Sequence, residues 1–183
     1  MRKLIRLLVV AMVVVVGAGC ATKSSFDAAD PSMKLSAESK FEVTKIDDKS
    51  GFTPSGEDVD PAKAMQAALE AELEKSGLAG KDYRINVTIS EYKPGNAFAR
   101  WLMPGMGGTY LKTRSSIIDT EGKIVAVIPV DRTVAAGGGF TIGAWRECFK
   151  EVAEEIVKVL QREMGILPPK NGLDEKKNDG VSL

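Results

Sequence analysis

Apolar and polar residues alternate most regularly between residues 83 and 92. The apolar positions are Tyr83, Ile85, Val87 and Ile89, and the residues between them are polar. Because successive side chains of a strand point to opposite faces, this period of two predicts a strand with one buried and one exposed face. Other extended runs predict three further strands, over residues 41–46, 109–119 and 123–134.

Two other segments place apolar residues three and four positions apart, which predicts helices. The first helix begins at Asp60-Pro61, since Asp is a good N-cap and Pro is tolerated at the first helical position, and it ends before Gly77. The second runs from about residue 144 to residue 164. Its apolar stripe consists of Trp145, Cys148, Phe149, Val152, Ile156, Val159 and Leu160.

The order of these elements predicts an α+β fold. We expect a two-layer sandwich, β-α-β-(long loop)-β-β-α, with both helices on one face of a four-stranded sheet. A turn at residues 119–122 joins the last two strands as a hairpin. The single domain would span residues 41–167, and the polar segment 168–183 is predicted to be a disordered tail.

The first nineteen residues have the three parts of a secretory signal peptide. A basic start is followed by the apolar run 7–16 and by Gly17-Ala18-Gly19. The apolar run has about ten residues at ~1.5 Å each, roughly half of a ~30 Å hydrocarbon core. The pattern therefore favours a signal peptide over a transmembrane helix.

Small residues leading directly into Cys20 resemble the lipobox of bacterial lipoproteins, although Gly17 stands where that family usually has Leu. The resemblance implies cleavage before Cys20, diacylation of its sulfur and acylation of the new amino terminus. Ala21 follows instead of the Asp that usually signals inner-membrane retention, so we expect an outer-membrane anchor facing the periplasm. Residues 20–40 would be the lipidated N-terminus and a flexible tether. The alternative is non-lipidating cleavage.

Composition restricts the possible chemistry. The chain of 183 residues has 25 Lys plus Arg, 25 Asp plus Glu, two cysteines and no histidine. A balanced charge argues against a nucleic-acid partner, and the lack of histidine excludes His-based triads and His metal ligands. Cys148 falls on an apolar helix stripe, where a buried and inert thiol is expected. We therefore expect no enzyme activity, no metal and no cofactor.

Residues 91–108 form an unusually apolar connection. Here the chain resembles the bacterial lipoprotein family called domain of unknown function 4410, through Lys93-Pro94-Gly95-Asn96, Arg100-Trp101, Pro104-Gly105-x-Gly107, the turn at residues 119–122 and the C-terminal helix. The family implies a lipoprotein signal, a compact α+β domain and no assigned activity.

Two interpretations of this loop stay open. In the first, it binds an envelope protein or the lipid surface, and the protein is a non-catalytic binding or assembly accessory. In the second, the loop folds back onto the core, and the protein is a structural envelope lipoprotein. An enzyme of an unrecognised type is a third alternative. The candidate interaction residues are Phe98, Arg100, Trp101, Leu102, Met103 and Met106.

Overall fold

The computed structural model describes residues 20–54, 59–96, 107–134 and 144–168. They form a mixed sheet of six strands with two helices packed on it, which confirms the α+β class. The strands are β1 (Cys20–Ser24), β2 (Asp27–Ala28), β3 (Phe41–Asp48), β4 (Tyr83–Lys93), β5 (Thr109–Ile118) and β6 (Ile124–Val134). The helices are α2 (Pro61–Lys75) and α4 (Ala144–Glu163).

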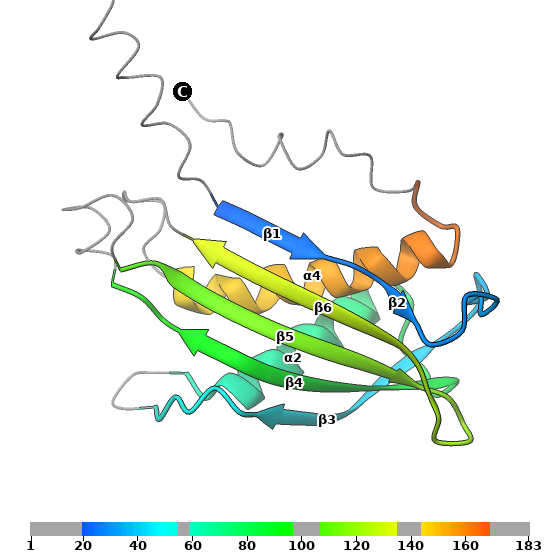
Figure 1. Ribbon diagram of the computed structural model, residues 1–183, viewed down its shortest axis with the longest axis horizontal. Coiled ribbons are helices and arrows are strands. Elements are labelled where there is room, and N and C mark those ends of the chain that lie inside the picture. The colour runs from blue at the N-terminus through cyan, green and yellow to red at the C-terminus, as the bar shows by residue number, and fades with distance from the viewer. Residues whose placement is uncertain (1–19, 55–58, 97–106, 135–143, 169–183) are drawn as a thin grey trace, which may run out of the picture.

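The sheet has the strand order β1-β6-β5-β4-β3. β2 also pairs with β6, further along that strand than β1. β3 and β4 are parallel and are connected through α2, whereas the other pairs are antiparallel. Figure 1 shows both helices behind the sheet, with the opposite sheet face turned to the viewer. The four strands and two helices predicted from periodicity are all present, with ends that agree within two residues.

The prediction of a four-stranded sheet is wrong, because β1 and β2 come from the segment expected to be a flexible tether. β1 pairs with β6 over five residues, from Cys20 opposite Val134 to Ser24 opposite Val130. Leu35 and Ser39, later in the same segment, are also buried. Residues 20–40 are thus built onto the domain rather than held apart from it.

The break between β1 and β2 lies beside Pro129. The β1 ladder ends opposite Val130, and the β2 ladder begins opposite Val127. Proline has no N–H to donate, which accounts for the missing ladder on this side of β6, while on the other side the β5 ladder continues with Arg114 opposite Pro129.

The core lies between the sheet and the two helices. Its strand residues follow the alternation expected from the sequence, and its helix residues follow the apolar stripes. The central members are Met65, Leu69, Leu73, Ile85, Val87, Ile89, Leu111, Ile117, Ile128, Phe149, Val152, Ile156 and Leu160. Asp60 caps α2 by accepting hydrogen bonds from the backbone N–H groups of Ala62 and Lys63, as predicted.

Candidate functional site: the Cys20 strand and its surroundings

Cys20, the predicted lipid-attachment residue, is the first residue of β1. Its backbone pairs with Val134 at the end of β6, and Val134 pairs in turn with Thr109 at the start of β5. Figure 1 shows that β4 also ends, and α4 also begins, at this end of the sheet. We call it the Cys20 end, and we call the end that holds the turn at residues 119–123 the far end.

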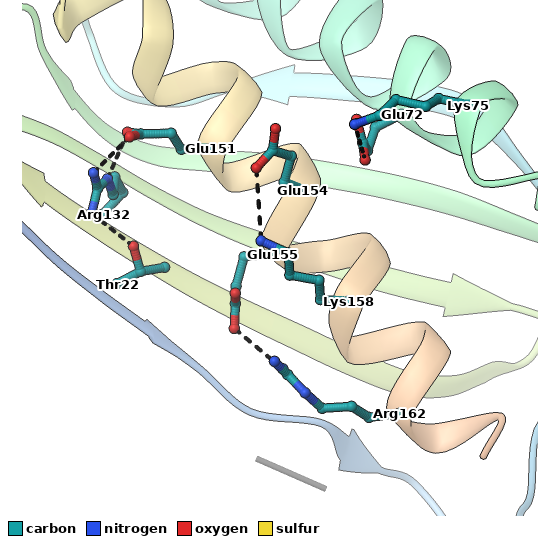
Figure 2. A network of polar contacts seen from close by, with 9 residues as sticks. All are labelled: Thr22, Glu72, Lys75, Arg132, Glu151, Glu154, Glu155, Lys158 and Arg162. Atoms are coloured by element: carbon teal, nitrogen blue, oxygen red, sulfur yellow. Dashed lines mark hydrogen bonds and ion pairs between the residues drawn. The ribbon is translucent and has the colours of Figure 1, made fainter. Parts of the chain in front are cut away.

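A buried arginine connects β1 to β6 and α4. The Arg132 side chain is 8% exposed and forms two 2.7 Å hydrogen bonds to the Glu151 carboxylate, from Nε to Oε2 and from Nη2 to Oε1. Its Nη1 donates to Oγ1 of Thr22 on β1, at 2.9 Å. Two parallel bonds between a guanidinium and a carboxylate are a strong, directional arrangement. We call Thr22, Arg132 and Glu151 the Arg132 cluster (Figure 2).

A second polar contact fixes the other half of β1. The Ser24 hydroxyl donates to Oε1 of Glu155 at 2.6 Å, and Nη1 of Arg162 lies 3.5 Å from the same oxygen. The side chains of Glu155 and Arg162 are 12% and 18% exposed. Both half-buried residues of β1 thus bond to charged networks that involve α4, although the strand has no hydrophobic pattern.

The Arg132 cluster was not predicted from the sequence, although one signal points to it. The buried residues of β6 alternate as Ala126, Ile128, Val130, Arg132 and Val134. A cation in phase with buried apolar residues requires a buried acceptor, because an unpaired buried charge is costly. Glu151 supplies that acceptor from α4.

The predicted interaction residues Phe98, Arg100, Trp101, Leu102, Met103 and Met106 lie outside the described residues. The structure does describe the residues on either side of that segment. Asn96 donates its backbone N–H to the Gly107 carbonyl at 2.9 Å, and the Thr109 hydroxyl donates to the Pro94 carbonyl at 2.7 Å. The segment therefore leaves and re-enters the fold at the Cys20 end.

Aromatic side chains gather at the same end. The Tyr92 hydroxyl donates to the Trp145 carbonyl at 3.1 Å, and the Tyr92 ring packs against Phe52 and Phe149. The Arg146 guanidinium lies 4.4 Å from the centroid of the Trp145 ring. These contacts join the first turn of α4 to the end of β4.

The sheet face away from the helices is polar. Glu91 accepts hydrogen bonds from Lys112 and Lys93, and these contacts hold the pKa of its carboxyl below the usual value. The bond to Glu91 also raises the pKa of the Lys112 ammonium group. This confirms the prediction of one buried and one solvated face for β4, and β5 alternates in the same way.

Cys148 is buried in the core, as predicted. Burial is the main reason why the pKa of its thiol rises to about 12, and the thiol donates to the Trp145 carbonyl at 3.3 Å. A nucleophile needs an accessible thiolate, so this cysteine has the properties of a structural residue.

Within the described residues, no three or more Cys, Asp or Glu side chains gather in a way that could hold a metal ion. In the same ranges, neither helix has the length and apolar character needed to cross a membrane.

Comparison with known proteins places this fold among bacterial domains. The family model described as "Domain of unknown function (DUF4410)" matches residues 34–138, more than half of the chain. None of the curated proteins compared with the chain matches it.

Solved structures share the fold at low sequence identity. The PelC dodecamer from Paraburkholderia phytofirmans has a TM-score of 0.53 at 13% identity, covering 78% of this chain and 97% of that one. A point variant of PelC in another crystal form has a TM-score of 0.52 at 14% identity, with coverages of 76% and 97%. A DUF330 protein from Xanthomonas campestris has a TM-score of 0.46 at 12% identity, with coverages of 74% and 89%.

Proposed function

Since this chain belongs to the DUF4410 family, whose function is unknown, we propose its function from β1, the strand that begins with the predicted lipid-attachment residue Cys20. We propose a lipid-anchored protein of the cell envelope, held on the periplasmic side of the outer membrane, that acts as a non-catalytic binding or assembly accessory. The observation that carries the proposal is the small-residue run Gly17-Ala18-Gly19 before Cys20, together with the place of Cys20 as the first residue of a sheet strand.

The chemistry of the chain supports a non-catalytic role. The sequence has no histidine, and the pKa of the Cys148 thiol is raised to about 12, which keeps this thiol protonated at neutral pH. The buried Arg132 and its partner Glu151 have their hydrogen bonds directed to β1 and α4. These contacts hold the fold together, and the guanidinium donates its hydrogen bonds to side chains of the same chain.

Metabolic labelling with a clickable fatty acid tests the anchor. Wild-type protein should carry the label and partition into detergent, and Cys20→Ala should lose the label and accumulate as precursor or soluble protein. The matched control is Cys148→Ala, which removes the other cysteine and should leave labelling unchanged. An unlabelled wild-type protein would end the lipoprotein proposal.

Crosslinking in cells tests the accessory role and the candidate loop. Wild type should form crosslinked products that Trp101→Ala loses, while the melting temperature of the variant stays unchanged. Trp101→Phe serves as the conservative control and should keep the products. If Trp101→Ala instead lowers the melting temperature by many degrees, the side chain is part of the core and the loop is not the binding surface.

The same crosslinking experiment distinguishes two kinds of partner. The PelC structure is described as a dodecamer, so assembly with further copies of this chain is one form that the accessory role could take. Products whose masses are multiples of one chain would indicate self-assembly, and products of other masses would indicate a different envelope protein. Absence of any product would favour the structural role.

A further inference from the structure

Strand pairing at Cys20 leaves no tether between the predicted lipid anchor and the folded domain. Cys20 pairs with Val134, and the next residue, Ala21, pairs with Thr133. The thioether of a lipidated cysteine is attached at its Cβ, so the acyl chains would be joined to a residue that already belongs to the sheet. A flexible tether of twenty residues would instead span roughly 25 Å.

Contacts along the whole length of β1 oppose its release from the sheet. The strand forms a ladder of five residue pairs with β6. Thr22 accepts a hydrogen bond from Arg132, and Ser24 donates one to Glu155. Both partners are charged groups held by α4 or bonded to it, and hydrogen bonds to charged groups are stronger than neutral ones. The anchor residue is therefore fixed with respect to the domain.

Side chains around the anchor are of the kinds found at membrane–water interfaces. On the sheet, the Lys93 ammonium lies 5.9 Å from the centroid of the Tyr110 ring, and Lys93 pairs with Tyr110 in the β4–β5 ladder. On the helix layer, Arg146 lies over Trp145. Aromatic rings with one polar edge, and long basic side chains with apolar stems, both favour the headgroup region.

The side chains described above lie at one end of the molecule. Ala21, Thr133, Tyr110 and Lys93 follow one another in a row across four strands, one residue in from Cys20. α4 begins at the same end (Figure 1), and Trp145 is its second residue. The Tyr92 hydroxyl donates a hydrogen bond to the Trp145 carbonyl. The far end is separated from this row by nearly the full length of β6, about 35 Å for eleven residues at ~3.4 Å each.

We propose that the Cys20 end is the membrane-facing surface of the domain, and that its partner is the phospholipid bilayer that holds the anchor. The domain stands directly on the headgroup layer, with Tyr110, Lys93, Trp145 and Arg146 at headgroup depth and the far end pointing into the periplasm. This proposal rests on the proposed acylation of Cys20. It adds a fixed orientation, which a tethered domain would not have.

Fluorescence quenching in vesicles tests the orientation. Full-length acylated protein is reconstituted in phosphatidylcholine vesicles that contain a lipid with a nitroxide on its headgroup. An environment-sensitive fluorophore is attached to Thr133→Cys at the Cys20 end or to the matched Thr120→Cys in the far-end turn. The parent protein, whose other thiol is the buried Cys148, gives the labelling background. We expect the label at position 133 to lose most of its fluorescence and the label at position 120 to lose none.

A tethered variant supplies the control. Insertion of about twenty Gly/Ser residues between Cys20 and Ala21 keeps the signal sequence and the acylated residue but adds a span of roughly 25 Å. Quenching at position 133 should then fall to the level seen at position 120. Equal quenching at both positions without the insertion, or quenching at position 133 that the insertion does not reduce, would overturn the proposal.

The same experiment distinguishes a missing lipid anchor from a wrong orientation of the domain. A protein that does not co-float with the vesicles is not acylated, which contradicts the proposed function. A protein that co-floats while the label at position 133 stays unquenched is anchored but does not face the bilayer with its Cys20 end. Melting temperatures of the labelled variants, compared with the parent, confirm that each retains the fold.

Discussion

Replacing Glu151 by Gln should destabilise the protein more than replacing its partner Arg132 by Met. The two side chains form the bidentate pair of the Arg132 cluster, but their exposures differ. The arginine side chain is 8% exposed and the glutamate side chain is 39% exposed. Removing the carboxylate charge leaves a buried guanidinium without its counter-ion, whereas removing the guanidinium leaves a carboxylate that water can reach.

The magnitude follows from this asymmetry. Breaking a fully buried ion pair by removing one partner costs about 3–5 kcal/mol. Because water reaches part of the Glu151 side chain, we expect about 2–3 kcal/mol for Glu151→Gln and about 1 kcal/mol for Arg132→Met. The double variant Arg132→Met/Glu151→Leu removes both charges, so it should cost less than Glu151→Gln alone.

Urea unfolding followed by circular dichroism measures these differences. The protein used begins at residue 20 and carries Cys20→Ser, which keeps every described residue without acylation. The matched control is Glu154→Gln, on the same helix, whose carboxylate lies 3.7 Å from Lys158 at the surface. That pair should be worth under about 0.5 kcal/mol. A cost for Glu151→Gln no greater than that of the control, or a double variant that costs as much as Glu151→Gln alone, would contradict this prediction.

Three further predictions concern substitutions of single residues. Cys148→Ala should lower stability by about 1–2 kcal/mol at pH 7 through loss of buried volume, measured by urea unfolding. Since the folded-state pKa of this thiol is raised from 9.0 to about 12, the unfolded state releases its proton first. Wild type should therefore lose about 1.4 kcal/mol per pH unit above pH 9 relative to Cys148→Ala, and parallel pH profiles would contradict the burial. Ser115→Ala should leave the melting temperature unchanged or raise it, because the buried Ser115 hydroxyl has no hydrogen-bond partner in the described structure; a clear fall would mean that the hydroxyl is bonded. Gly122→Ala should cost about 1 kcal/mol in urea unfolding, because Gly122 has φ +87° in the β5–β6 turn; an unchanged midpoint would show that the turn relaxes.

Much of the fold could be predicted because its core follows simple periods. The alternation from Tyr83 to Ile89 identified β4, and the stripe through Cys148 and Val152 identified α4. In each case burial of apolar side chains holds the element in place, so the sequence pattern and the structure have the same cause.

β1 could not be predicted in this way, because polar contacts hold it. Thr22 and Ser24 are short polar residues that occur equally well in loops, and they become informative only beside Arg132 and Glu155. These partners lie at least 110 positions later in the chain. No local pattern reports such a distant pairing.

The candidate site was likewise predicted in part. Cys20 stood out through the small residues that precede it, which are typical of a processing signal rather than of a fold. Its place beside Val134 depends on strand order, which is a property of the whole sheet. The interaction residues proposed between Phe98 and Met106 stay a prediction, since they lie outside the described residues.

Pairing of the first strand with the last affects the order of acylation and folding. If the chain is exported from its N-terminus, as the proposed function requires, Cys20 crosses the inner membrane well before Arg132 and Val134 do. Until then β1 has no strand to pair with, because its partner β6 is the last strand of the sheet. An acylating enzyme would therefore meet an extended, unpaired peptide at Cys20. If Cys20 is acylated as proposed, sheet closure is a late step of maturation, and it draws the domain toward the bilayer only after the anchor is in place.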